Sequence, residues 1–322
     1  MNRLLVTQAI FPESLAELDG SSIVVDVRDS DEPMERADLI ARLDGYDGVV
    51  CMLTDRIDAE VLAQNPQLKV VANVAVGFDN IDVVAADKLG IVVTNTPDVL
   101  TETTADLTFA LILAVARRIP EADVFVRSGL WERWKLQPEQ VGTDVHGKVL
   151  GLFGMGRIAK AVARRAAHGF GMEVLYTSRR ELPQDDNDVG ATRVELDELL
   201  ERSDVLSLHA PLTPETRHVI GARELARMKD TAILINTARG PLVDAEALAD
   251  ALVAGRLWGA GLDVFAQEPE VEATLLALKE RVVLAPHIGS ATVQARQAMS
   301  RQALANARDV LEGRNPQNPV RL

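Results

Sequence analysis

Residues 148–166 read "KVLGLFGMGRIAKAVARRA", an apolar strand-like run followed by a glycine-rich turn and a helix-like pattern. The turn is a G-x-G-x-x-A motif, in which Gly154 permits a tight turn and Gly156 lets the backbone approach a pyrophosphate. Ala159 replaces the third glycine and still allows close packing of helix on strand. The alternative is an ordinary tight turn of an α/β protein. The full strand–turn–helix context favours a dinucleotide-binding unit whose helix N-terminus attracts phosphate.

The next strand along the chain bears on the choice of cofactor. Residues 174–180 read "VLYTSRR" and lie about 20 residues after the first glycine, where an acidic residue usually binds a ribose 2′-hydroxyl. Thr177 stands near that place and has no charge to repel a phosphate, whereas Arg179 and Arg180 can bind one through planar guanidinium groups. The sequence therefore predicts that NADP(H) is preferred and that NAD(H) is possible. The alternative is a solvated arginine pair at a strand end.

Short apolar runs rich in Val and Ile alternate with helix-like stretches along the whole chain. One set, with "SIVVDV", "GVVCML" and "LKVVANVAV", occupies the first third, and a second set begins near residue 148 with "KVLGLFG", "AILINTA" and "VVLAPHI". Runs this continuous indicate parallel strands that are buried on both faces. Two successive sets of alternating strands and helices predict an α/β protein with two doubly wound domains.

Two further stretches lie outside these sets. Residues 98–129 have a polar start and a long apolar run, and we predict one long helix that bridges the domains and ends at Gly129. Residues 291–313 are predicted to form another helix, ended by Gly313, which packs back on the first domain.

Length and composition limit the class of protein. A chain of 322 residues with 47% hydrophobic and 25% charged residues is typical of about two globular domains. The net charge of −14 disfavours nucleic acid and anionic membranes as partners. No apolar run is long enough for a membrane span, and the N-terminus lacks the features of a signal peptide. Together with the single cysteine, Cys51, this predicts a cytoplasmic protein.

Charged side chains follow three predicted strands of the second set. Arg239 ends "AILINTARG", Glu268 follows "GAGLDVF", and His287 follows "VVLAP". Each alone is usually structural, but ligands of open α/β sheets bind at the carboxyl ends of the strands. Carbonyl reduction needs a proton donor, for which histidine is suited, a carboxylate that orients the histidine, and a cation that binds the substrate. These three residues are therefore the candidate catalytic set.

Other chemistries find less support in the sequence. The remaining histidines, His146, His168, His209 and His218, show no metal-ligand spacing, so no metal site is predicted. There is no G-x-S-x-G motif, and Cys51 has no recognisable base partner, so nucleophilic catalysis is unsupported.

The chain resembles the D-isomer-specific 2-hydroxyacid dehydrogenases over essentially its whole length. The resemblance rests on "ANVAVGFDNID", "TPDVLTETTADLTFALIL", "GTDVHGKVLGLFGMGRIA", "INTARGPLVD", "GLDVFAQEP" and "PHIGSAT", which occur in the family's order. Within the family, the chain is most similar to the glyoxylate/hydroxypyruvate reductases that also reduce 2-ketogluconate. The implied fold is a Rossmann cofactor domain, residues 101–289, inserted in a flavodoxin-like substrate domain, residues 1–100 plus 290–322.

The resemblance also implies roles for individual residues. His287 would donate the proton and Glu268 would pair with it, while Arg239 would bind the substrate. The substrate-binding residues are Val76, Gly77, Arg239 and Ser290, the first two through their backbone. The cofactor-binding residues are Gly154, Met155, Gly156, Arg157, Ile158, Ser178, Arg179, Arg180, Thr237, Ala238, Asp263 and Gly289. An arm near residues 117–147 would form a homodimer, with Trp131 and Trp134 interpreted as interface packing.

The predicted function is NADPH-dependent reduction of small 2-oxo acids to D-2-hydroxy acids, with glyoxylate, hydroxypyruvate and 2-ketogluconate as candidate substrates. One alternative is an NAD-linked dehydrogenase of the phosphoglycerate type. The stretch "TDRID", which lacks that group's Arg-Ser pair, and the arginines at 179 and 180 argue against it. A second alternative is a non-catalytic nucleotide sensor of the corepressor type, which retains the same catalytic set.

Overall fold

The computed structural model describes residues 1–321 as two compact units. Unit 1 contains residues 1–100 and the segment from residue 291 onward, and unit 2 contains residues 101–290. Each unit has one sheet in which all strand pairs are parallel. The prediction of two parallel-sheet α/β domains is confirmed.

Unit 1 is built on a five-stranded sheet of order β2-β1-β3-β4-β5. Its strands are β1 (Arg3–Val6), β2 (Val24–Val27), β3 (Gly48–Cys51), β4 (Val70–Asn73) and β5 (Val92–Thr94). This is the strand order of flavodoxin-like folds. Strands β3 and β4 are buried at every residue, as expected for parallel strands covered on both faces.

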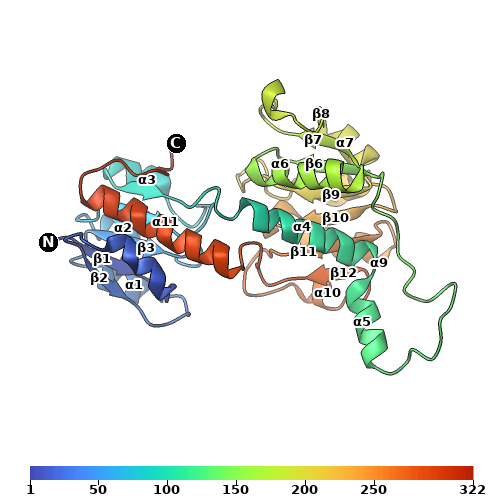
Figure 1. Cartoon of the computed structure of the whole chain (residues 1–322), viewed down its shortest axis with the longest axis horizontal. Helices are drawn as coiled ribbons and strands as arrows, with labels where there is room; N and C mark the ends of the chain where they lie inside the picture. The colour runs from blue at the N-terminus through green and yellow to red at the C-terminus, as the bar shows by residue number, and fades with distance from the viewer. Residues whose placement is uncertain (322) are drawn as a thin grey trace. The chain divides into compact units, whose positions relative to one another are not determined.

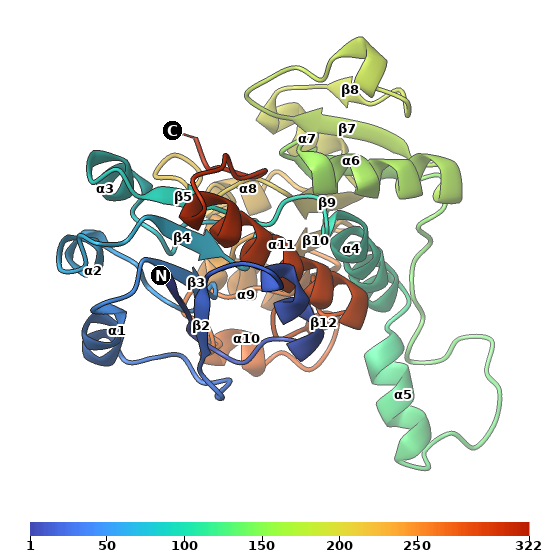
Figure 2. The ribbon, with the colours of Figure 1, turned by 60° about the vertical axis from the view of Figure 1, so that its left-hand side comes forward.

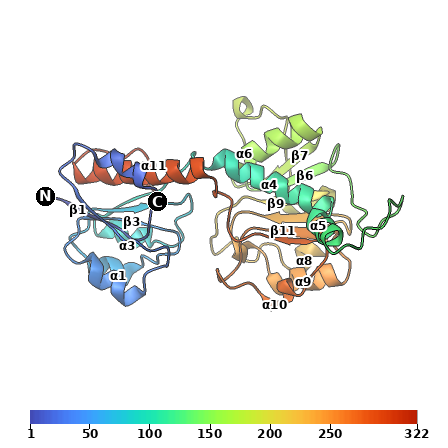
Figure 3. The ribbon, with the colours of Figure 1, turned by 60° about the horizontal axis from the view of Figure 1, so that its bottom comes forward.

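Helices cover both faces of the unit 1 sheet. They are α1 (Arg36–Leu43), α2 (Ala59–Ala63), α3 (Val83–Lys88), α11 (Val293–Leu311) and the 3₁₀ helix η1 (Pro12–Leu18). The last helix, α11, packs on η1 and on β3 and β4, and Figure 3 shows it on the face opposite α1. It begins at Thr292, whose side chain accepts a hydrogen bond from the N–H of Ala295, and Gly313 follows its end with a positive φ.

Unit 2 is built on a seven-stranded sheet of order β12-β11-β10-β9-β6-β7-β8. Its strands are β6 (Val149–Phe153), β7 (Glu173–Thr177), β8 (Thr192–Arg193), β9 (Val205–Leu208), β10 (Ile233–Asn236), β11 (Gly259–Leu262) and β12 (Val282–Leu284). Counted from β6, this is the Rossmann order with one added strand. The strand order reverses between β6 and β9, which is where doubly wound sheets bind their ligands.

Two helical layers enclose the unit 2 sheet. The helices are α4 (Thr101–Ala116), α5 (Ile119–Arg127), α6 (Arg157–Arg164), α7 (Leu196–Arg202), α8 (Ala222–Leu225), α9 (Ala245–Val253) and α10 (Ala273–Leu276). Helices α4 and α6 pack side by side on one face, as Figure 1 shows, and α4 also contacts β10 and β11. Helix α6 continues through a π-helical turn to Gly169.

The prediction of a single long helix over residues 98–129 is wrong. The structure divides it into α4 and α5, because Arg118 between them adopts a left-handed φ of 52° and Pro120 stands in the first turn of α5. Helix α5 has no buried residue. It and the segment that follows extend away from the unit 2 sheet (Figure 2).

No helix within residues 1–321 combines the length and apolar character needed to cross a membrane. No group of three or more His, Cys, Asp or Glu side chains in that range is arranged to hold a metal ion.

Candidate active site

The glycine turn follows β6 and is closely packed. Gly154 has a φ of +96°, and a Cβ added to it would lie 2.7 Å from the carbonyl oxygen of His209. Its N–H donates to the carbonyl of Thr177, at the end of β7, over 2.8 Å. Both the conformation and the close approach of the β9 loop therefore require glycine.

The N-terminus of α6 is suited to an anion. Gly156 is its N-cap, no side chain caps the helix, and its first turn carries no acidic residue. Apart from its chain neighbours, no heavy atom of the described chain lies within 4 Å of the position that a Cβ of Gly156 would take, so the space beside Gly156 is open. Ala159 is fully buried against the sheet. These features fit a pyrophosphate held by backbone donors.

The end of β7 presents arginines. Arg179 and Arg180 are exposed, and the Thr177 hydroxyl is turned inward, donating to the carbonyl of Val194 over 2.6 Å. The guanidinium of Arg193 donates to the carbonyl of Ser178 over 3.0 Å. Sequence reasoning missed this third arginine, because only the pairing of β7 with β8 brings it to the same edge.

The side chain of Asn236 supports the turn that carries Arg239. Asn236 is 1% exposed; its Nδ2 donates to the carbonyl of Arg239 over 2.8 Å, and its Oδ1 accepts from the N–H of Ala238 over 3.0 Å. A Cβ on Gly240 would lie 2.0 Å from the carbonyl carbon of Phe265, so the turn is pressed against the loop that leads to Glu268. The sequence predicted Arg239 but not its support.

His287 and Glu268 are in direct contact. The Nδ1 atom of His287 lies 2.7 Å from the Oε2 atom of Glu268, whose Oε1 accepts from the N–H of Phe265 over 3.0 Å. Burial alone raises the pKa of the Glu268 carboxyl. The hydrogen bond and charge of His287, the Phe265 N–H and the charge of Arg239 outweigh burial and hold that pKa below its usual range. Glu268 is therefore a carboxylate at neutral pH.

The contact between the two side chains fixes the tautomer of His287. An ionised carboxylate can only accept a hydrogen bond, so Nδ1 of His287 carries the hydrogen. Its Nε2 atom is left for other partners, and the side chain is 27% exposed. This is the arrangement of a histidine that exchanges a proton with a ligand.

Asp263 holds the loop of His287. It is 1% exposed, and its oxygens accept hydrogen bonds from the N–H groups of Ile288, over 2.7 Å, and Gly289, over 2.8 Å. Burial raises the pKa of Asp263 although both N–H groups oppose that shift. His287 itself has a left-handed φ of 53°, a conformation that these bonds stabilise. Any contact between Asp263 and the cofactor stays a prediction.

Helix α4 braces two of the predicted cofactor-binding turns. The hydroxyl of Thr104 donates to the carbonyl of Gly289 over 3.1 Å, and the hydroxyls of Thr108 and Thr237 lie 3.0 Å apart. Both threonines of α4 are buried. The positions of the turns after β10 and β12 are thereby tied to one rigid element.

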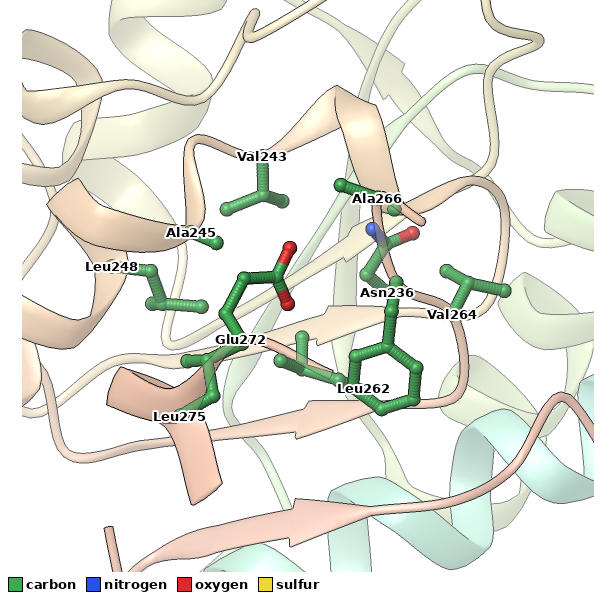
Figure 4. Close-up of a pocket in the computed structure, with 11 residues that line it drawn as sticks. Asn236, Val243, Ala245, Leu248, Leu262, Val264, Ala266, Glu272 and Leu275 are labelled. Atoms are coloured by element: carbon green, nitrogen blue, oxygen red, sulfur yellow. The ribbon is translucent and has the colours of Figure 1, made fainter. Parts of the chain in front are cut away.

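A small cavity lies next to the turns that follow β10 and β11. Its lining is mostly apolar and includes Asn236, Gly240 and Phe265. Figure 4 shows the carboxylate of Glu272 pointing into it, and one oxygen of that carboxylate is buried without a hydrogen-bond partner among the described residues. The three candidate catalytic side chains do not line the cavity, so we assign it to packing under the site.

The predicted residues of unit 2 therefore gather at one edge of its sheet. They follow β6, β7, β10, β11 and β12, and the structure brings Arg239, Glu268 and His287 within electrostatic reach of one another. Val76 and Gly77 belong to unit 1, in the loop after β4. The roles of all these residues remain predictions.

Comparisons with known proteins agree with this geometry. A family model described as "D-isomer specific 2-hydroxyacid dehydrogenase, NAD binding domain" matches residues 109–289. The chain is 50% identical over 288 residues to a glyoxylate reductase from Thermococcus litoralis, covering 88% of this chain and 86% of that protein.

Two solved structures are similar over almost their full length. One is a protein from Thermus thermophilus, with a TM-score of 0.91 and 46% identity, covering 99% of this chain and 100% of that one. The other is an NADPH-dependent glyoxylate/hydroxypyruvate reductase from Sinorhizobium meliloti in complex with NADP and malonate. Its TM-score is 0.87 at 35% identity, covering 99% of this chain and 96% of that one.

Proposed function

The chain belongs to the D-isomer specific 2-hydroxyacid dehydrogenases, and from this premise we propose that it reduces small 2-oxo acids to D-2-hydroxy acids with NADPH. Glyoxylate and hydroxypyruvate are the first candidate substrates, and 2-ketogluconate is a further one. The observation that carries the proposal is the contact of 2.7 Å between His287 and Glu268, with Arg239 in electrostatic reach. The names of the reductases from Thermococcus litoralis and Sinorhizobium meliloti support the substrate class.

Each side chain of the set has one role in the proposed reaction. The nicotinamide supplies a hydride when bound. Arg239 binds the substrate carboxylate and polarises the adjacent carbonyl through its guanidinium. His287 donates a proton from Nε2 to the carbonyl oxygen, and the carboxylate of Glu268 stabilises its imidazolium form and fixes the ring. Ser290 and the backbone of Val76 and Gly77 complete the substrate contacts.

The cofactor would be held by the turns at the edge of the unit 2 sheet. The turn from Gly154 to Ile158 would hold the pyrophosphate. The turns after β10 and β12, which lie nearer the catalytic set, would contact the cofactor through Thr237, Ala238 and Gly289. Arg179, Arg180 and the neighbouring Arg193 would bind a 2′-phosphate, so NADPH would be preferred over NADH. The NADP complex of the Sinorhizobium meliloti relative supports this choice.

Removing two of these arginines should change cofactor choice. We expect Arg179→Ala with Arg180→Ala to raise KM for NADPH at least about 10-fold and to leave KM for NADH nearly unchanged, because charge-assisted hydrogen bonds to the phosphate are lost. Steady-state rates with each cofactor measure this. A matched control is Arg223→Ala with Arg227→Ala, which removes two positive charges of unit 2 that pair with Asp197 and do not follow β7. An equal change with both cofactors would mean that the pair does not recognise the phosphate.

We also propose that the domains and the arm are those of the family. Residues 1–100 plus 290–322 would form the substrate domain and residues 101–289 the cofactor domain, with an arm near residues 117–147 that forms a homodimer. The arm exposes large apolar side chains, which a partner would cover. Examples are Leu130 (64% exposed), Trp131 (60%), Trp134 (76%) and Leu136 (80%).

The arm can be tested through the oligomeric state. Trp131→Ser with Trp134→Ser should shift the protein from dimer to monomer, because these aromatic side chains would be central to the buried area. Size-exclusion chromatography with light scattering measures the mass. Val253→Ser with Leu276→Ser removes exposed apolar side chains outside the arm and should leave the dimer intact. A monomeric wild type, or a dimeric tryptophan variant, would count against the proposal.

A further inference from the structure

We infer that Asn95 and Asn73 are positioning residues, whose side-chain amides turn the backbone N–H groups of the loop after β4 toward the substrate carboxylate. The inference rests on the proposed function, in which Val76 and Gly77 bind that carboxylate through their backbone. The inference adds two residues that would shape the loop after β4 into a binding site for the carboxylate, called the carboxylate cradle below. All of these residues belong to unit 1.

Three consecutive carbonyls of the loop accept hydrogen bonds from elsewhere in unit 1. The carbonyl of Ala75 accepts a hydrogen bond from the N–H of Thr96 over 2.9 Å. The carbonyl of Val76 accepts from Nδ2 of Asn95 over 2.7 Å. The carbonyl of Gly77 accepts from Nδ2 of Asn73 over 2.8 Å. Two asparagine side chains and one backbone amide thus fix three successive peptide planes.

Peptide geometry sets the direction of the opposite groups. In a planar trans peptide, the N–H points away from the carbonyl of the same unit. Fixing the Val76 carbonyl on Asn95 therefore aims the N–H of Gly77 the other way, and the same holds for the N–H of Val76 and of Phe78. Among residues 1–321, no hydrogen bond takes up these three N–H groups. Successive backbone N–H groups that have no partner in the chain are donors from which an anion can accept hydrogen bonds.

The loop lies where the chain passes from the core of unit 1 to its surface. Asn73 is fully buried at the end of β4, Gly77 is partly exposed and Phe78 is 37% exposed. The loop thus leaves the core between Asn73 and Phe78. Its three N–H groups lie in a partly exposed stretch, where a carboxylate can approach them.

The two asparagines are themselves held in place. Asn95 donates from its backbone N–H to the carbonyl of Asn318 over 3.2 Å, and its carbonyl accepts from Asn306 over 3.3 Å. The side chain of Asn73 hydrogen-bonds to that of Asn80, whose Nδ2 donates to two further backbone carbonyls of unit 1. An amide donor also brings no charge of its own, so it can orient the loop without competing for the carboxylate.

Asn65 provides a matched control in the same unit. Like that of Asn95, its Nδ2 donates to a backbone carbonyl, that of Val61, over 2.8 Å, and it is fully buried whereas Asn95 is partly exposed. That carbonyl belongs to α2 and not to the loop after β4. Asn65→Leu therefore removes the same kind of hydrogen bond without touching the proposed cradle.

The test compares Asn95→Leu with Asn65→Leu in the full chain. Asn95→Leu should raise KM for glyoxylate about 10-fold, the cost of misaligning a hydrogen bond to a charged group, and leave KM for NADPH unchanged. It should also weaken the preference for glyoxylate over its methyl ester, which lacks the carboxylate, whereas Asn65→Leu should keep that preference. Thermal unfolding shows whether each variant folds, and Asn95→Ala takes the place of Asn95→Leu if the latter does not.

The possible failures can be told apart. If the wild type reduces glyoxylate and the Asn95 and Asn65 variants show the same KM and the same acid-over-ester preference, the inference is overturned and the proposed function stands. If the wild type reduces no 2-oxo acid with either cofactor, the proposed function falls, and the inference falls with it.

Discussion

Replacing His287 by alanine is expected to lower kcat for glyoxylate at least about 100-fold, the usual cost of losing a general acid. The ring is held by Glu268 over 2.7 Å at Nδ1, which leaves Nε2 as the atom that can protonate the carbonyl oxygen. Because the side chain is not proposed to anchor the substrate carboxylate, KM should change much less than kcat. Steady-state kinetics at saturating NADPH separate the two parameters.

His168→Ala is the control for this experiment. His168 is an exposed histidine of unit 2 in the π-helical turn after α6, and it takes no part in the strand-end set. Its replacement should leave kcat unchanged. Near-normal turnover of the His287 variant would remove His287 from the role of proton donor, whatever else it contacts.

Replacing Arg239 by glutamine is expected to lower kcat/KM for 2-oxo acids by about 10³-fold. The variant loses charge-assisted hydrogen bonds to the substrate carboxylate and the positive charge that stabilises developing negative charge on the carbonyl oxygen. Both KM and kcat should therefore change, unlike in the His287 variant. Arg239→Lys should be intermediate, because lysine keeps the charge but not the planar fork.

Cofactor binding serves as the control for Arg239. Fluorescence titration with NADPH should give nearly the same Kd for the wild type and the glutamine variant, because Asn236 braces the Arg239 turn through backbone groups that the substitution leaves in place. A loss of NADPH binding equal to the loss of kcat/KM would show that Arg239 acts on the cofactor or on the fold. It would then not be the substrate anchor.

Much of the fold could be predicted because the decisive signals are local. The G-x-G-x-x-A turn and the strand before it lie within a few residues, and the structure requires glycine at position 154 for both its φ of +96° and its contact with His209. Apolar runs at regular spacing predicted two parallel sheets. The charged side chains that follow three strands predicted that Arg239, Glu268 and His287 lie near one another, since parallel strands end at a common edge.

The remainder depends on contacts between distant parts of the chain. Arg193 reaches the end of β7 only through strand pairing, and Asp263 holds the His287 loop over a separation of about 25 residues. Asn236 and Asn95 act through hydrogen bonds to backbone carbonyls, for which no sequence pattern exists. The division of the predicted long helix, by contrast, is a local effect of Arg118 and Pro120, which an interpretation based on apolar periodicity passes over.

The most direct test is to measure initial rates with glyoxylate and with hydroxypyruvate, using NADPH and NADH in parallel on the purified chain. We predict turnover of both acids with a kcat/KM at least about 10-fold higher with NADPH, because the arginines after β7 are proposed to bind the 2′-phosphate. A preference for NADH would still support a dehydrogenase, but it would show that those arginines are solvated surface residues that do not bind the cofactor. The absence of turnover with either acid and either cofactor would contradict the proposed function and favour a nucleotide sensor on the same fold.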